Sequence, residues 1–313
     1  MTEGRLKFVF AAALIALDAV WIVWRGIDFD LASLALAVGV TALTAAIGYA
    51  YTRLRPDERL ATMGAETAFL IAYSAAACIF SYLVTTLDRP LIDDVLVKWD
   101  GALGFNWYAY VGFVNARPWL GVLSSTLYQT TLAQIALSVV LLCLIGRTDR
   151  TREMTSIVMV SSFFCVVVSG ILPSAGALAY YHPSAAFYMQ NHPVVDLVYK
   201  QQFFDIRHGL MTHLSLKGLH GLVAFPSYHV GLSVILMLAF RGVKGWFWPV
   251  VALNTLVILS TPIDGGHHLS DALGGIVLAL VCAGAVIWLR KRLPQPARVA
   301  AQENYGDLAG QKA

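Results

Sequence analysis

Two short segments that contain histidine have the residue types and spacing for acid–base or nucleophilic chemistry. They are FPSYH at residues 225–229 and GGHHLSD at residues 265–271. In the second segment His267 and Asp271 are four residues apart, so on a helix they share one face. A carboxylate in that position fixes the tautomer of the imidazole and raises the basicity of its other nitrogen. The spacing therefore predicts His267 as an oriented nucleophile.

The first segment has the residues of a helix start. Pro226 is favoured in a first helical turn, and Ser227 can cap the helix. Because the free N–H groups at a helix start attract anions, the natural ligand here is a phosphate. His229, two residues after Ser227, is placed to protonate a leaving oxygen as a general acid.

The adjacent histidines of the second segment leave two other interpretations open. His268 is three residues from Asp271 and would also reach it on a helix. A metal site that combines both histidines with His229 and Asp271 is the other interpretation, but HHxxD is not a recognised ligand spacing. All four cysteines lie in apolar runs and lack a metal-ligand pattern. We therefore expect neither a metal nor another cofactor.

The composition is that of an integral membrane protein. Hydrophobic residues make up 58% of the 313 residues, charged residues make up 13%, and the mean hydropathy is +0.66. A helix of about 20 apolar residues crosses roughly 30 Å of hydrocarbon. We predict an all-α, polytopic membrane helix bundle of about eight spans, with the bilayer as its solvent. The candidate spans are 8–24, 31–51, 67–87, 119–145, 155–175, 227–240, 246–260 and 268–289.

The distribution of positive charge predicts the orientation. Most of the 22 lysines and arginines fall in short segments on the side of both termini, so the termini are expected in the cytoplasm of a plasma or inner membrane. Loops 88–118 and 176–226 and both histidine segments then lie on the outer, periplasmic side. We divide the chain into two N-terminal helices (1–65), a catalytic membrane domain (66–290) and a cytoplasmic tail (291–313). The net charge of +3 does not indicate nucleic acid as a partner, and the oligomeric state is left open.

The two segments together resemble the type 2 phosphatidic acid phosphatase superfamily. Its members carry PSGH and SR-x5-H-x3-D on neighbouring helices and form a phosphohistidine. FPSYH, HHLSD and the stretch DIRHG at 205–209 are most similar to the branch of aureobasidin-resistance inositol phosphorylceramide synthases. The resemblance covers residues from about 85 to 290 and implies a six-span phosphatase-like core. It also implies His267 as nucleophile, Asp271 as its partner, His229 as acid, and Ser227 with Tyr228 at the phosphate.

Two cationic elements of the family pattern are absent from the sequence. The upstream K-x6-RP element is not found on the outer face, and Thr261 stands where an arginine is expected six residues before the nucleophile. Arg207 is the best substitute, because a guanidinium grips phosphate oxygens through two parallel hydrogen bonds. Lys200, Lys217 and Arg117 are weaker candidates. We expect His182, His192, His213 and His220 to be solvated or hydrogen-bonded without a catalytic role.

The expected activity is cleavage of a phosphoester in a lipid phosphate or phospholipid at the outer membrane face. Water as acceptor makes the protein a phosphatase, and a lipid or polyol hydroxyl makes it a phosphotransferase of the inositol phosphorylceramide synthase type. The alternative of another class is a membrane transporter, because Asp18, Gln129 and Gln134 are polar groups within apolar spans. For Gln129 and Gln134 we favour headgroup or interhelical contacts, and His268 is a further possible substrate contact. A catalytically inactive relative is also left open.

Overall fold

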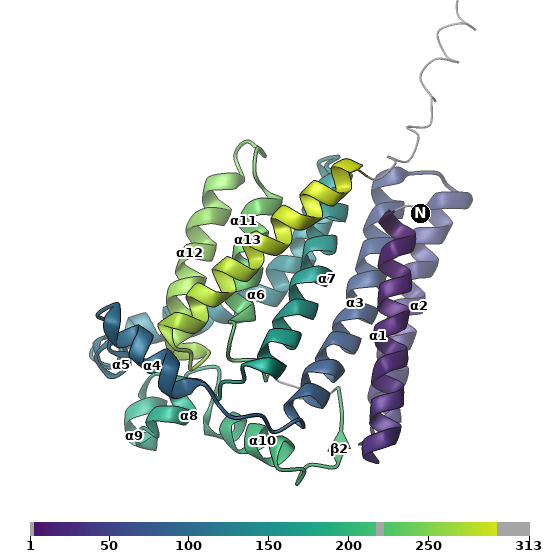
Figure 1. Cartoon of the computed structure of the whole chain (residues 1–313). Coiled ribbons are helices and arrows are strands. Elements are labelled where there is room, and N and C mark those ends of the chain that lie inside the picture. Colours follow the sequence, from purple (N-terminus) through teal and green to yellow (C-terminus); the bar gives the residue numbers. More distant parts are fainter. Residues whose placement is uncertain (1–2, 217–221, 293–313) are drawn as a thin grey trace, which may run out of the picture.

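The protein is a bundle of long apolar helices, as seen in a computed structural model that describes residues 3–216 and 222–292 (Figure 1). Seven helices among the described residues are long and apolar enough to cross a membrane, and the shorter apolar α11 (Tyr228–Ala239) joins them. The all-α polytopic architecture is thereby confirmed, and the chain is a multi-pass membrane protein. The seven are α1 (Glu3–Arg25), α2 (Leu31–Arg53), α3 (Glu58–Thr85), α6 (Pro118–Leu144), α7 (Thr148–Ile171), α12 (Phe247–Asp264) and α13 (Leu269–Arg292).

Local sequence signals set several helix boundaries. Asp30 caps α2 by accepting the Ala32 N–H, and Asp57 caps α3 by accepting the N–H groups of Arg59 and Leu60. Pro118 occupies the first turn of α6, where its missing N–H costs no hydrogen bond. The apolar runs then continue until the next polar turn. Each predicted span therefore overlaps an observed helix, although α3 and α7 begin nine and seven residues before the predicted starts at 67 and 155.

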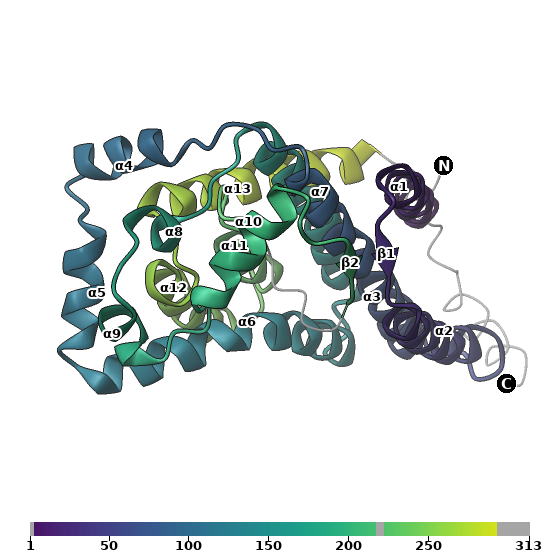
Figure 2. The same cartoon turned by 90° about the horizontal axis from the view of Figure 1, so that it is seen from below.

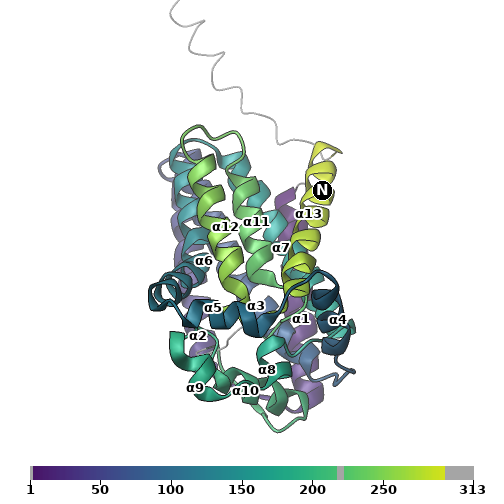
Figure 3. The ribbon, with the colours of Figure 1, turned by 90° about the vertical axis from the view of Figure 1, so that its left-hand side faces the viewer.

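Helix α11 lies at the centre of the bundle and contacts α6, α7, α12 and α13 (Figure 3). Leu142, Ile157, Ile235 and Ala279, from α6, α7, α11 and α13, are almost completely buried in the core between these helices. With 12 residues, α11 is about 18 Å long and shorter than the hydrocarbon layer. It begins at Tyr228, so the start of the predicted span at 227–240 is close to the observed one.

The two N-terminal helices stand at one side of the bundle and pack on α3 (Figures 1 and 2). Gly48 and Gly64 face each other there, and a side chain on either would meet backbone atoms within 3 Å. The strand β1 (Asp28–Phe29) after α1 pairs in parallel with β2 (His213–Leu214), which ties this pair of helices to the loop ahead of α11. The predicted domain boundary at residue 65 falls inside α3.

Short helices cover the end of the bundle at which both histidine segments lie (Figures 1 and 2). They are α4 (Asp93–Ala102), α5 (Trp107–Asn115), α8 (Ala177–Tyr181), α9 (Ala185–Tyr188), the 3-10 helix η1 (Met189–Asn191) and α10 (Leu197–Arg207). Loops 88–118 and 176–226 therefore contain helical caps. The start of α1 and the end of α13 lie at the opposite end of the bundle. Residues 293–313 of the predicted tail lie outside the described residues, as do Lys217 and His220.

Candidate active site

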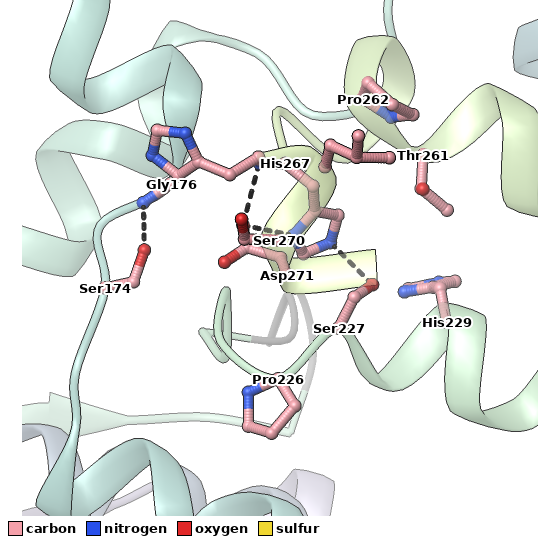
Figure 4. A network of polar contacts seen from close by, with 12 residues as sticks. Ser174, Gly176, Pro226, Ser227, His229, Thr261, Pro262, His267, Ser270 and Asp271 are labelled. Carbon is pink, nitrogen blue, oxygen red and sulfur yellow. Dashed lines mark hydrogen bonds and ion pairs between the residues drawn. The ribbon is translucent and has the colours of Figure 1, made fainter. Parts of the chain in front are cut away.

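Ser227, His267 and Asp271 form a line of polar contacts at the capped end of the bundle (Figure 4). His267 lies in the turn between α12 and α13, and Asp271 lies in the first turn of α13. The Nδ1 atom of His267 is 3.3 Å from the Asp271 Oδ2 atom, and its Nε2 atom is 3.2 Å from the Ser227 Oγ atom. With the Nδ1 proton directed at the carboxylate, the Nε2 atom keeps its lone pair for an electrophile.

The start of α11 is held against α13 by the backbone. The Ser227 N–H donates to the Asp271 carbonyl oxygen over 2.9 Å. A Cβ atom at Gly275 would lie 2.2 Å from the Ser227 carbonyl oxygen, so only glycine permits this approach. Ser227 is the N-cap residue, yet its hydroxyl faces His267 and makes no capping hydrogen bond. The positive end of the α11 dipole is thus presented at His267.

His229 lies in the first turn of α11, two residues after Ser227 (Figure 4). Its Nδ1 atom is 3.1 Å from the hydroxyl oxygen of Tyr128, on α6. The two rings are stacked, with centroids 4.3 Å apart and planes inclined by 21°. Tyr128 therefore fixes the His229 ring, and one imidazole nitrogen remains for a proton transfer near the Nε2 atom of His267.

His268 turns away from His267 and lies between two acidic side chains of α4. Its Nε2 atom is 3.3 Å from Asp93 Oδ1, and its Nδ1 atom is 3.6 Å from Asp100 Oδ2. Burial opposes protonation of His268, but the contacts with Asp100 and Asp93 outweigh it and raise its pKa from 6.5 to about 9. The His268 side chain is fully buried. Its contacts hold it against α4, next to the candidate nucleophile in the chain.

Asp93 and Asp100 join α4 to the candidate site, and sequence reasoning did not single them out. Asp93 accepts hydrogen bonds from Ser174 Oγ and from the N–H groups of Ala175 and Gly176. The carboxylate of Asp100 accepts the first N–H groups of α13, those of Leu269 and Ser270, at 3.0 and 2.8 Å. These bonds and His268 lower the pKa of Asp100 although burial opposes the shift.

One signal for this pair was present in the sequence. Asp93 and Asp100 are seven residues apart, which places both on one face of a helix. With Leu96 they form the buried face of α4. Residues 88–118 were predicted as an outer loop, so this spacing was not used.

Two residues predicted to bind phosphate have other partners. The Arg207 Nε atom is 2.7 Å from Asp88 Oδ1, and the guanidinium also donates to the carbonyl of Arg89. The Tyr228 hydroxyl donates to the Val158 carbonyl of α7 over 3.0 Å. Each of the two side chains thus satisfies its polar group on a neighbouring segment. The assignment of Arg207 and Tyr228 to the phosphate stays a prediction.

Two of the three weaker cationic candidates lie within the described residues, and both have other partners. Lys200 contacts His182, while the guanidinium of Arg117 lies over the ring of Phe113 at 4.0 Å. Thr261 is fully buried, and its hydroxyl donates to the Ile258 carbonyl of its own helix. At the position where the family pattern expects an arginine, the side chain is therefore a buried threonine that hydrogen-bonds within α12.

The polar residues of α6 make contacts within the bundle. Gln134 Oε1 accepts a hydrogen bond from Asn254 Nδ2 of α12 over 2.9 Å, and Gln134 Nε2 donates to Thr130 within α6. Gln129 donates to the carbonyl of Ser125, one turn earlier. Of the two expected roles, an interhelical contact is the one observed for Gln134.

The arrangement can perform a nucleophilic displacement at phosphorus with His267 as nucleophile and His229 as proton donor. In the described part of the chain, no group of three or more His, Cys, Asp or Glu side chains is arranged to hold a metal ion. Comparisons with curated proteins and with solved structures gave no match. The family model of the PAP2 superfamily matches residues 94–285, which span α4 to α13 and contain both histidine segments. Because this match covers more than half of the chain, the protein belongs to the PAP2 superfamily, as its two motifs predicted.

Proposed function

We propose that this protein cleaves a phosphoester of a membrane lipid through a phosphohistidine at His267. The observation that carries the proposal is the Ser227–His267–Asp271 line, with Nε2 of His267 at the uncapped start of α11. Membership of the PAP2 superfamily supports phosphatase or phosphotransferase chemistry. The long apolar helices support a substrate that resides in the bilayer.

The reaction has two steps. In the first, Nε2 of His267 forms a bond to phosphorus while the bond from phosphorus to the lipid oxygen breaks, and His229 gives its proton to that oxygen. In the second, a water or alcohol oxygen gives up its proton to His229 and attacks phosphorus, and the N–P bond breaks. Asp271 holds the imidazole in the required tautomer throughout and stabilises its positive charge.

Charge that develops on the phosphoryl oxygens is met by the start of α11. The backbone N–H groups of the first turn and the Ser227 hydroxyl are fixed donors, and fixed donors need no reorganisation when charge develops. Ser227 is fully buried and His267 is 4% exposed. In such a dry environment each donor acts more strongly than it would in water.

Trapping of the covalent intermediate tests the mechanism. Purified protein is mixed with a lipid phosphate labelled with radioactive phosphorus and quenched within one turnover. Because a phosphohistidine is lost in acid and survives base, while a phosphoserine behaves in the opposite way, the label also separates His267 from Ser227 as the nucleophile. We expect a base-stable label in the wild type and in S227A, and no label in folded H267A. A base-labile label that disappears in S227A would instead assign the nucleophile to serine.

The finer alternative is a phosphotransferase of the inositol phosphorylceramide synthase type, whose donor is a phosphodiester. It is supported by the packing of Thr261 and by the pairing of Arg207 with Asp88, which leave fewer cations for a phosphate dianion. A phosphodiester carries only one negative charge and needs less compensation. Incubation with a phospholipid donor, with and without ceramide or diacylglycerol acceptors, tests this by mass spectrometry. A product formed only with an acceptor supports the transferase, and phosphate release from a monoester without acceptor supports the phosphatase.

The proposal includes an active site on the outer face of a plasma or inner membrane, with both termini in the cytoplasm. The excess of lysine and arginine at the end opposite the histidine segments supports this orientation. A cysteine introduced at the exposed Asp94 of α4 provides the test. It should react with a membrane-impermeant thiol reagent in intact cells, and reaction only after lysis would reverse the orientation.

A further inference from the structure

A large apolar groove runs along α13 from the candidate site towards the opposite end of the bundle. Its volume is about 680 Å³, within the range of about 300–1,000 Å³ that is usual for ligand pockets. It is lined by α4, α7 and α13 and by the segment just before α11. Trp99 and Ala102 come from α4, Val168 comes from α7, and Leu273 and Val277 come from α13.

The groove has the chemistry of a hydrocarbon site. Ser270 is the one lining residue with a hydroxyl, and that hydroxyl already donates to Asp100 over 2.5 Å. Trp99, Leu103 and Val277 are each more than half exposed although they are apolar. In a membrane helix bundle such side chains face lipid, so the groove opens sideways to the bilayer.

The inner end of the groove is lined by residues that adjoin the candidate site in the sequence. Pro226 lines it and immediately precedes Ser227, and Ser270 lines it and immediately precedes Asp271. Gly274 forms part of the same wall, and a Cβ atom there would lie 2.8 Å from the ring of Phe225. The glycine thus lets Phe225 and Pro226 lie flat against α13 between the groove and Ser227.

Helix α4 connects the groove with the nucleophile. Its face with Asp93 and Asp100 contacts His268 and the start of α13, and Trp99 and Ala102 of the same helix line the groove. A chain lying in the groove therefore contacts the same helix that positions the residue next to His267.

We propose that this groove holds one hydrocarbon chain of the substrate lipid, so that the phosphate at the head of that lipid reaches Nε2 of His267. The proposal rests on the proposed function, because it assigns the tail of the same substrate. The inner end of the groove is lined by the residues that precede Ser227 and Asp271, and this position favours the substrate over a resident bilayer lipid. The groove then selects substrates by the length and bulk of one chain.

Filling the groove at Val277 tests the proposal. The variant V277W places an indole in the groove, and L280W is its matched control, because Leu280 is half-exposed on the same helix and does not line the groove. Both variants are assayed with a long-chain phosphatidic acid and with a water-soluble short-chain analogue. Displacing about two methylenes from the groove corresponds to a change of about tenfold. We expect kcat/KM of V277W to fall about tenfold or more for the long-chain lipid relative to the short-chain analogue.

A second readout identifies the occupant. A phosphatidic acid with a photoreactive group in its acyl chain should label peptides of α7 and α13 in the wild type and in L280W, and less so in V277W. Excess unlabelled substrate should suppress the labelling. If excess substrate does not suppress the labelling, the groove holds a resident lipid. If V277W loses activity equally towards the long-chain lipid and the short-chain analogue, the substitution only damages the structure. Either result overturns the proposal. If the wild type cleaves neither lipid, the phosphatase form of the proposed function fails, whereas turnover of both with an unchanged ratio in V277W refutes the groove alone.

Discussion

Replacement of Asp100 by asparagine is expected to destabilise the start of α13 and with it the candidate nucleophile. The carboxylate accepts two backbone N–H groups and the Ser270 hydroxyl, and it lies 3.6 Å from Nδ1 of His268. An asparagine keeps one acceptor oxygen, but its NH2 group is a donor and cannot accept a hydrogen bond from the N–H and O–H groups that face it. It also leaves His268 with Asp93 as its one remaining carboxylate neighbour on α4.

The size of the effect follows from these contacts. A hydrogen bond to a charged group contributes about 1.5–3 kcal/mol, and loss of one partner from a buried ion pair costs about 3–5 kcal/mol. Asp100 is 2% exposed, so solvent screens these interactions little. Because asparagine retains part of the hydrogen bonding, we expect D100N to lower the free energy of unfolding by about 3 kcal/mol.

Thermal unfolding in detergent measures the change, and the same helix supplies a control. Asp94 is the neighbour of Asp93 but is exposed, and it accepts one hydrogen bond from Tyr180. We expect D94N to change the free energy of unfolding by no more than about 0.5 kcal/mol. Turnover by folded D100N should also fall, since His267 is two residues before the first N–H group that Asp100 binds. Equal melting of D100N and the wild type would refute the role assigned to α4.

Three further predictions concern the candidate site and its surroundings. H267A should fold normally but lose turnover, whereas D271N should keep turnover about 10⁴-fold below the wild type, because Asp271 only orients the imidazole; equal rates in steady-state assays of H267A and the wild type would refute the mechanism. The raised pKa of His268 predicts that its protonated form stabilises the folded protein by about 3 kcal/mol. This stabilisation is complete below pH 6.5 and is lost as the pH rises through about 9. Melting temperatures measured against pH should show this loss in the wild type but not in H268Q. Q134L should lower the free energy of unfolding by about 1 kcal/mol, because it removes the bond to Asn254, and leave KM unchanged; a raised KM would restore Gln134 as a substrate contact.

The helices and the local geometry of the second motif were predictable because their causes lie within a few residues. The thickness of a bilayer requires long apolar runs, and these runs overlap the observed helices. The contact of His267 with Asp271 follows from the rise and turn of a helix, which bring residues four apart onto one face. Both are consequences of chain geometry alone.

The partners of His268 and Arg207 were not predictable because they are distant in the sequence. Asp93 is separated from His268 by 175 residues, and Asp88 is brought to Arg207 by the packing of α10 near α3. Spacing could place Asp93 and Asp100 on one helix face but not say what that face contacts. By spacing alone either of the adjacent histidines could reach Asp271, and only the family resemblance favoured His267; the fold gives the two side chains different partners.

The charge around the candidate site bears on which phosphate it can accept. Asp271 contacts His267, and Asp93 and Asp100 flank His268 immediately behind it, so three acidic side chains are grouped with one histidine of raised pKa. Thr261 adds no charge where the family pattern has an arginine. A phosphate dianion would be repelled by this group more strongly than a monoanion, since the Coulomb energy scales with the charge. The start of α11 offers the equivalent of roughly half a positive charge, which matches a monoanion better than a dianion. The charge distribution therefore favours a phosphodiester, the donor of a phosphotransferase, over a phosphomonoester.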